Sequence, residues 1–190
     1  MKRYQNPFLV LLLCGVFAQA LLVIGHTRDA EEPFAAAPAV LVGDTLATLS
    51  GQLPDGTSTV VPLTADPGTM TVLYSFHPEC EHCDTVAPVW ASHFASADPT
   101  VRRIAVTADL HEPAVTYAAR FGWSVDLLSV SQLGLTDREY SLVSRTPWLF
   151  AFDWNGVLRF QGHGSELDRV KQVVAAMAAG GKRHVVGGTE

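Results

Sequence analysis

The stretch that decides the fold is Met70-Thr-Val-Leu-Tyr-Ser-Phe-His-Pro-Glu-Cys80-Glu-His-Cys83. Its first seven residues form an apolar, β-rich run between turn residues, which predicts a buried strand. Apolar side chains at helical spacing then run from Cys83 to Phe94 and predict a helix that Pro88 kinks. The Cys-x-x-Cys motif therefore lies where a buried strand passes into a helix. A helix N-terminus favours thiolate over thiol because it carries partial positive charge and unpaired N–H groups.

The two cysteines of this motif are predicted to form one catalytic redox unit. Two intervening residues let one turn of helix bring the sulfurs together, so the pair can cycle between dithiol and disulfide. We expect Cys80, on the exposed side, to attack a partner's disulfide and Cys83 to resolve the mixed disulfide. Protonated His82 would stabilise the Cys80 thiolate, whereas the Glu79 and Glu81 carboxylates would destabilise it by like-charge repulsion. These three residues are therefore expected to tune the reduction potential of the cysteine pair. No cofactor besides the disulfide is expected.

Composition excludes several classes of function. The chain has 190 residues, of which 48% are hydrophobic and 17% charged, so disorder over most of its length is excluded. A net charge of −6 offers no basic surface for nucleic acid. The three cysteines are too few for a disulfide-stapled scaffold, and Cys14 lies in an apolar leader. Only Cys80 and Cys83 remain for chemistry.

Residues 1–25 are predicted to be a signal anchor or a signal peptide. Lys2 and Arg3 precede the apolar run 8–24 and acidic residues follow it, which places the N-terminus in the cytoplasm and the domain outside. Cleavage after Ala20, in the small-x-small sequence Ala18-Gln-Ala20, would release a secreted protein. The apolar run continues beyond Ala20, which favours an uncleaved anchor at the extracytoplasmic (periplasmic) face of the cytoplasmic membrane.

The rest of the chain predicts one domain. Residues 26–39 are rich in Ala, Pro and Glu and predict a linker, residues 40–180 a single domain, and residues 181–190 a flexible tail. Further strands are predicted at 59–63 and 101–106, and a helix at 112–121. A short helix is predicted to begin with a capping box at Thr136 and to end near Val143. An antiparallel pair at 148–152 and 157–160 is joined by Asn155-Gly156, and a final helix is capped by 165–168 and stopped by Gly180-Gly181. This order predicts an α/β sandwich with a mixed central sheet flanked by helices.

Residues 40–177 resemble the thioredoxin fold, and within it the membrane-anchored TlpA/ResA-like family of extracytoplasmic thiol-disulfide oxidoreductases. Pro88 stands where thioredoxins kink their active-site helix, and Thr146-Pro147 stands where they carry a cis-proline loop facing the disulfide. The resemblance implies that Thr146, Pro147 and Trp148 bind protein partners. It also implies protein thiols and disulfides as substrates, a membrane-embedded or soluble thiol as redox donor, a reductase role, and cytochrome c biogenesis as a candidate pathway.

Departures from the family leave alternatives open. Glu79 replaces a tryptophan of most relatives, and Tyr74 stands where thioredoxins place a buried acid that assists proton transfer. His82 occupies the position of histidine in the Cys-Pro-His-Cys motif of the oxidant DsbA, which suggests disulfide oxidation instead of reduction. A metal-delivery protein is the rival from another class, because His77, Cys80, His82 and Cys83 could together hold zinc or cuprous copper. Clients and oligomeric state are not specified by the sequence.

Overall fold

The computed structural model describes residues 19, 38–96 and 98–185. Apart from residue 19, the predicted membrane segment lies outside the described residues, as do most of the predicted linker and the last five residues of the tail. A search of the described part of the chain finds no helix with the length and apolar character that a membrane crossing requires.

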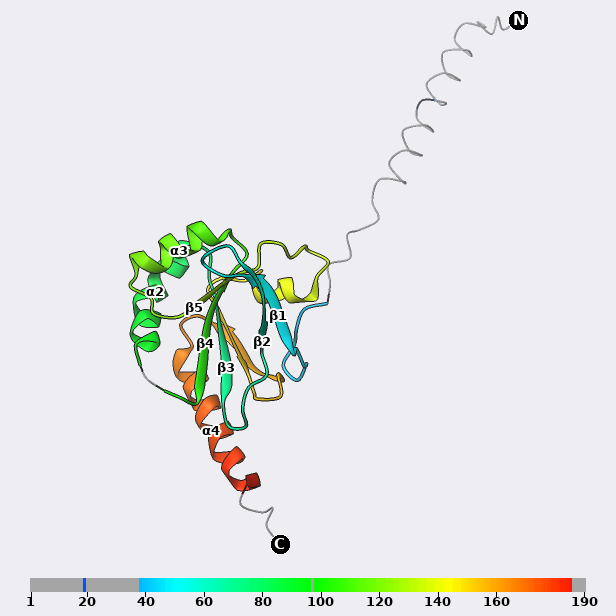
Figure 1. The fold of residues 1–190 in the computed structure, drawn as a ribbon, viewed down its shortest axis with the longest axis vertical. Coiled ribbons are helices and arrows are strands. Elements are labelled where there is room, and N and C mark those ends of the chain that lie inside the picture. The colour runs from blue at the N-terminus through cyan, green and yellow to red at the C-terminus, as the bar shows by residue number, and fades with distance from the viewer. Residues whose placement is uncertain (1–18, 20–37, 97, 186–190) are drawn as a thin grey trace, which may run out of the picture. The chain divides into compact units, whose positions relative to one another are not determined.

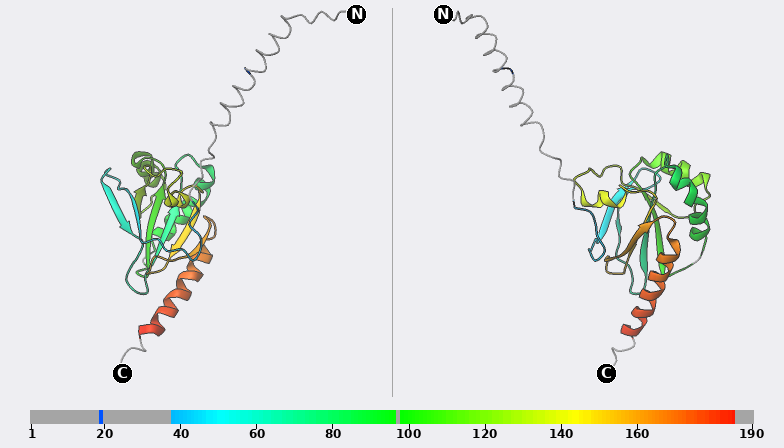
Figure 2. Two further views of the ribbon diagram at one scale, coloured as in Figure 1. Left: turned by 90° about the vertical axis from the view of Figure 1, so that its right-hand side faces the viewer. Right: turned by 180° about the vertical axis from the view of Figure 1, so that it is seen from behind.

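Seven strands form one mixed sheet in the order β2-β1-β5-β4-β3-β6-β7 (Figure 1). Strands β3, β4 and β5 are parallel, whereas β6 runs antiparallel to β3 and β7 antiparallel to β6. The β1–β2 hairpin forms one edge of the sheet, and the β6–β7 hairpin, followed by α4, forms the other (Figure 2). The strands are β1 (Thr48–Gln52), β2 (Ser58–Pro62), β3 (Met70–Ser75), β4 (Val101–Thr107), β5 (Asp126–Ser129), β6 (Trp148–Phe152) and β7 (Leu158–His163).

The sheet is covered on both faces. The helices are α2 (Glu81–Phe94), α3 (His111–Arg120), the 3₁₀ helix η1 (Arg138–Leu142) and α4 (Leu167–Val185). Buried residues of α2, α3 and α4 pack with Val72 and Tyr74 on one face, and the segment around Leu49 and η1 covers Leu73 on the other. All six residues of β3 are buried, which explains its continuous apolar sequence. The predicted α/β sandwich with a mixed sheet is thus confirmed.

The predicted bounds of most strands and helices near the Cys-x-x-Cys motif are confirmed. The strands predicted at 59–63, 70–76 and 101–106 and the helix at 112–121 each appear within one residue of their predicted bounds. Helix α2 begins at Glu81, two residues earlier than predicted, so Cys80 is its N-cap. Strands β1 and β5 were not predicted, because β1 contains one large apolar side chain, Leu49, and β5 has only four residues.

Both predicted capping boxes are wrong. The Asp137 carboxylate accepts the Gly134 N–H at 2.7 Å, and only a 3₁₀ helix follows. Before α4, the Glu166 carboxylate accepts the His163 N–H at 3.0 Å, while the Ser165 hydroxyl lies 2.8 Å from His163 Nδ1. In each case a side chain from another position of the turn satisfies the local N–H groups. Several side-chain acceptors in each turn compete for the same few backbone N–H groups, so sequence spacing alone does not select the acceptor.

Helix α4 keeps its predicted apolar face but not its predicted end. Leu167, Val170 and Val174 are buried, and Met177 packs against the same core. The helix continues through Gly180 and Gly181 to Val185, so these glycines do not stop it and the predicted flexible tail is helical up to residue 185. Glycine inside a helix costs only about 1 kcal/mol relative to alanine, which neighbouring turns can offset.

The β6–β7 hairpin turns where Asn155-Gly156 predicted it. Gly156 has a φ of +75°, which few other residues tolerate. Asp153 is buried, and its Oδ1 accepts the N–H groups of Asn155 and Val157 at 2.9 and 3.0 Å. Its Oδ2 pairs with Arg159 at 2.7 Å. The carboxylate therefore closes the turn and fixes the hairpin whose first strand follows Thr146-Pro147.

Candidate active site

Cys80 is the N-cap residue of α2. Its backbone is extended (φ −96°, ψ 110°), and its carbonyl oxygen accepts the N–H groups of Cys83 and Asp84 at 2.9 and 3.2 Å, the first hydrogen bonds of the helix. Its own N–H donates to the His77 carbonyl oxygen at 3.1 Å. This turn after β3 places the half-buried Cys80 thiol beside the positive end of the helix.

The two thiols, both reduced in this structure, differ in burial and in acidity. Cys83 is 1% exposed, and burial together with the neighbouring Cys80 raises the pKa of Cys83 to about 12. Burial also acts to raise the pKa of Cys80, but hydrogen bonds from the Cys83 thiol, from backbone N–H groups and from Thr146 outweigh it. The pKa of Cys80 is therefore lowered from that of an ordinary cysteine. Cys80 is the better nucleophile and Cys83 the shielded thiol.

The loop containing Thr146, Pro147 and Trp148 faces this pair. The Thr146–Pro147 peptide bond is cis, and the Cys80 thiol donates to the Thr146 carbonyl oxygen at 3.8 Å. Pro147 is buried, whereas Trp148 is half-buried at the start of β6, where it pairs with Ser75 of β3. The Ser75 hydroxyl donates to the Arg145 carbonyl oxygen at 3.1 Å and ties the loop to β3. The predicted partner-binding residues therefore lie next to the predicted nucleophile.

Two further residues hold this loop, and the sequence analysis missed both. The Gly164 N–H donates to the Pro147 carbonyl oxygen at 3.0 Å, and Trp90 Nε1 donates to the Gly164 carbonyl oxygen at 2.9 Å. A Cβ added at Gly164 would lie 2.7 Å from Pro147 Cβ and 2.8 Å from Trp90 Cζ2. Gly164 is thus a close-approach glycine between the proline loop and α2. The only sequence signal is the Gly162-His-Gly164 turn, which has no meaning until the fold brings it to Pro147.

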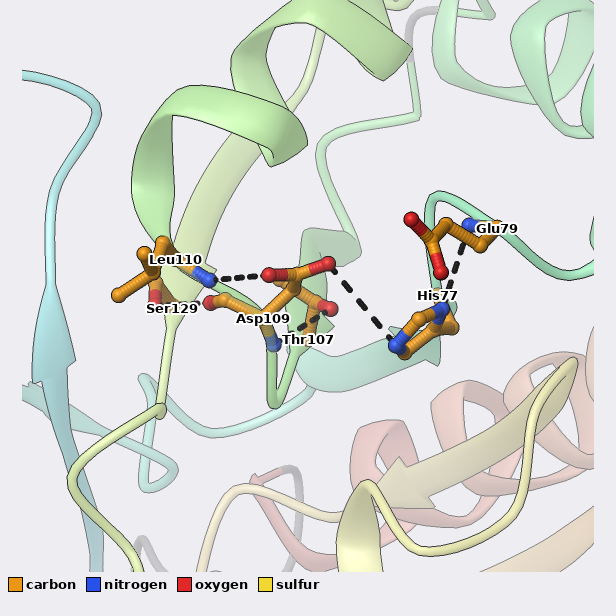
Figure 3. A network of polar contacts seen from close by, with 6 residues as sticks. All are labelled: His77, Glu79, Thr107, Asp109, Leu110 and Ser129. Carbon is orange, nitrogen blue, oxygen red and sulfur yellow. Dashed lines mark hydrogen bonds and ion pairs between the residues drawn. The ribbon is translucent and has the colours of Figure 1, made fainter.

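A polar network fixes the loop that precedes Cys80 (Figure 3). His77 Nδ1 accepts the Glu79 N–H at 3.2 Å, and His77 Nε2 lies 3.8 Å from Asp109 Oδ2. The Leu110 N–H donates to Asp109 Oδ1 at 2.7 Å, and the Ser129 hydroxyl donates to the Asp109 carbonyl oxygen. These contacts join the chain just beyond β3 and β4 to the end of β5. Through the bond from the Glu79 N–H, His77 supports the loop before Cys80, and Asp109 is a neighbouring residue that the sequence analysis missed.

The three residues expected to tune the reduction potential of the cysteine pair are exposed at the start of α2. Glu79, Glu81 and His82 all lie at the surface beside Cys80. Among the described residues, no group of three or more His, Cys, Asp or Glu side chains is placed to hold a metal ion. The His77, Cys80, His82 and Cys83 set is separated because His77 pairs with Asp109, His82 faces solvent and Cys83 faces the core. The geometry therefore gives no support to metal delivery.

Tyr74, which the resemblance to thioredoxins puts at the position of a buried acid, does not face the cysteines. Its ring packs against Trp90 and Phe94, with ring centroids 5.2 and 4.7 Å away, in the second half of α2. These residues lie about 10 Å or more along the helix axis from Cys83. The Tyr74 hydroxyl is buried and has no hydrogen-bond partner among the described residues, with the Arg103 guanidinium as its charged neighbour.

Comparisons with solved structures identify the fold. No protein-family model matches the sequence, and no curated protein matches it. The thioredoxin domain of a thiol-disulfide oxidoreductase from Bacteroides vulgatus has a TM-score of 0.58 at 16% identity, covering 72% of this chain and 99% of that one. A secreted Mycobacterium tuberculosis disulfide oxidoreductase homologous to E. coli DsbE gives 0.51 at 18% identity, covering 67% and 95%. A peroxiredoxin-like protein from Aquifex aeolicus gives 0.57 at 16%, covering 75% and 90%. The chain thus has a thioredoxin-like fold.

The difference between the two thiols predicts selective alkylation. Iodoacetamide at pH 7 should modify Cys80 and leave Cys83 unmodified, because only the thiolate reacts and the pKa of Cys83 is raised to about 12. The rate at Cys80 should rise with pH through a midpoint below that of the same residue in urea-unfolded protein. Peptide mass spectrometry separates the two sites. Equal modification of Cys83 in the folded protein would contradict this assignment.

Gly164→Ala should disturb the proline loop. The added methyl group would clash with Pro147 and Trp90, and overpacking of this kind lowers the free energy of unfolding by about 2 kcal/mol. Gly134→Ala is the matched control, because its Cβ would meet nothing closer than 3.6 Å. Urea unfolding checks both variants. If Gly164→Ala were as stable as the control, the close approach of the proline loop, α2 and the turn at Gly164 would not be required for stability.

Proposed function

We propose that this protein is a thiol-disulfide oxidoreductase that exchanges disulfides with protein partners through Cys80 and Cys83. The observation that carries the proposal is the asymmetry of the pair: a half-buried Cys80 with a lowered pKa at the N-terminus of α2, and a buried Cys83 one turn further on. We expect a partner's backbone to bind beside the Thr146 carbonyl oxygen, which lies next to Cys80. The fold alone also occurs in a peroxiredoxin-like protein, so the function is inferred from the site.

The chemistry follows from this asymmetry. The Cys80 thiolate attacks one sulfur of a client disulfide, forms a Cys80–client disulfide and releases the other client sulfur as a thiolate. Cys83 then loses its proton and attacks Cys80 Sγ. The Cys80–Cys83 bond forms, the Cys80–client bond breaks, and the client has gained the two electrons that the cysteine pair has lost. A thiol donor reverses these steps and regenerates the dithiol.

Reduction of client disulfides is the proposed direction. The resemblance to TlpA/ResA-like reductases supports this direction. The motif itself does not decide it, because the lowered pKa of Cys80 favours the reduced form, whereas the exposed Glu79 and Glu81 carboxylates beside it act against the thiolate. Oxidation, as in DsbA, remains the alternative that the reduction potential decides.

The proposed place of action is the extracytoplasmic side of the membrane. The leader supports this, with Lys2 and Arg3 before its apolar run and acidic residues after it. The M. tuberculosis oxidoreductase of similar fold is a secreted protein. Disulfides persist in oxidising compartments outside the cytoplasm, so clients for such an enzyme are found there.

Replacement of the resolving cysteine tests the proposed exchange. In Cys83→Ala the first attack proceeds but the mixed disulfide is not resolved, so covalent complexes with client or donor proteins should accumulate in the native host. They should appear on non-reducing gels and disappear on reduction. The matched control is Cys80→Ala, which should trap nothing because the remaining thiol is buried. Equal trapping by both variants, or by neither, would contradict the proposed roles.

A further inference from the structure

Trp90 belongs to the helix that starts at the cysteines and lies farther along it. It follows Cys83 by about two turns of α2, so the two side chains project from one face of the helix. The Trp90 ring is fully buried and meets the Tyr74 ring edge-on, with ring centroids 5.2 Å apart. The Trp123 ring also lies against it, with centroids 5.9 Å apart. The indole is therefore fixed in the core, and its N–H group has a fixed direction.

This N–H group bonds to the turn before α4. Trp90 Nε1 donates to the Gly164 carbonyl oxygen at 2.9 Å. Gly164 is itself buried, and no other donor to this carbonyl oxygen is found among the described residues. The Gly164 N–H in turn donates to the Pro147 carbonyl oxygen at 3.0 Å. Two hydrogen bonds through one residue thus connect α2 to the proline loop.

The proline loop is held on both sides of Thr146. On one side the Ser75 hydroxyl donates to the Arg145 carbonyl oxygen at 3.1 Å, and on the other Gly164 binds Pro147. The Thr146 carbonyl oxygen between these two contacts lies 3.8 Å from Cys80 Sγ. Ser75 ends the strand before the cysteines, and Trp90 lies in the helix after them. The position of the loop is therefore set relative to both elements that carry the thiols.

A peptide client uses more of this site than a small disulfide does. Attack on a small disulfide needs only the Cys80 thiolate and access to it. A peptide must in addition place its backbone beside the Thr146 carbonyl oxygen, as the proposed function expects. Binding to a loop that is already held in place costs less ordering than binding to a loop that must first be ordered. The bond from Trp90 should therefore matter for peptides and have little effect on small disulfides.

We propose that Trp90 is a positioning residue that favours peptide clients over small disulfides by holding the proline loop beside Cys80. This inference rests on the proposed function. Trp90 acts through Gly164 and Pro147 and not on the reacting sulfurs. Without its N–H group the Gly164 carbonyl oxygen would be buried without a donor, which is costly, so the turn would regain a partner only by moving. Such a movement would carry the attached Pro147 with it.

Trp123 offers a matched control for this role. Its Nε1 also donates to a backbone carbonyl oxygen, that of Ala87 in α2, at 3.1 Å. Its ring belongs to the same aromatic cluster as that of Trp90. Trp123→Phe and Trp90→Phe therefore remove the same kind of hydrogen bond from neighbouring rings. Only the second change removes a bond to the turn that reaches Pro147.

Two probes with the same leaving group separate peptide recognition from sulfur chemistry. One is a short unstructured peptide whose single cysteine carries a thionitrobenzoate group, and the other is N-acetylcysteine amide with the same group. In both, the Cys80 thiolate attacks the cysteine sulfur, the Cys80–probe disulfide forms, and thionitrobenzoate leaves with the electron pair of the broken bond. The ratio of the two second-order rate constants cancels the thiolate fraction of Cys80. It therefore reports recognition of the peptide.

The full-length wild type should react about 5-fold or more faster with the peptide, and Trp90→Phe should lose about that factor, which is the scale of one hydrogen bond. Trp123→Phe should keep the wild-type ratio. Because phenylalanine is smaller than tryptophan, a second variant, Trp90→3-benzothienylalanine, keeps the shape of the indole and replaces only its N–H group by sulfur. This variant should lose the preference for the peptide as well.

A wild-type ratio retained by either variant of Trp90 would overturn the positioning role. An equal loss in Trp123→Phe would overturn it too, because the effect would then come from general packing of the aromatic cluster. A wild type that reacts equally with both probes would show that the loop does not favour peptides, which also contradicts the inference. A wild type that releases thionitrobenzoate from neither probe would instead contradict the proposed function.

Discussion

Burial of the Cys83 thiol beneath the first turn of α2 is the constraint on which the rest of the site depends. All six residues of β3 and the following Phe76 are buried, so the chain leaves the core only after Phe76. The short turn held by His77 then starts α2 at Glu81. One helical turn points Cys83 into the core and leaves Cys80 at the N-cap. The opposite pKa shifts of the two thiols follow from this placement.

The cis-proline loop beside Cys80 depends on contacts between segments that are distant in sequence. The cis Thr146–Pro147 loop bonds to β3 through Ser75 and to the turn before α4 through Gly164. Trp90 of α2 bonds to that same turn. The nucleophile and the loop facing it are therefore held by one set of buried contacts. Such preorganisation limits the reorganisation needed when a partner's backbone binds.

The sequence predicts those parts of the fold that depend on local pattern. The buried strand at 70–76, the helix after Cys80 and the Asn155-Gly156 turn are each set by residues within a few positions of one another. Strand β5 is too short and too irregular in polarity to be recognised alone. Gly164 and Asp109 gain their roles only when the fold brings them to Pro147 and His77.

The reduction potential of the Cys80–Cys83 pair distinguishes a reductase from an oxidase. The full-length protein would be equilibrated in glutathione or dithiothreitol buffers of graded ratio and quenched, and the fraction of disulfide read by mass. We predict a reversible two-electron couple at about −270 mV, as in reducing thioredoxins. A couple at about −120 mV would contradict the reductase direction. If no disulfide forms between the two cysteines at any ratio, the oxidoreductase function itself is wrong.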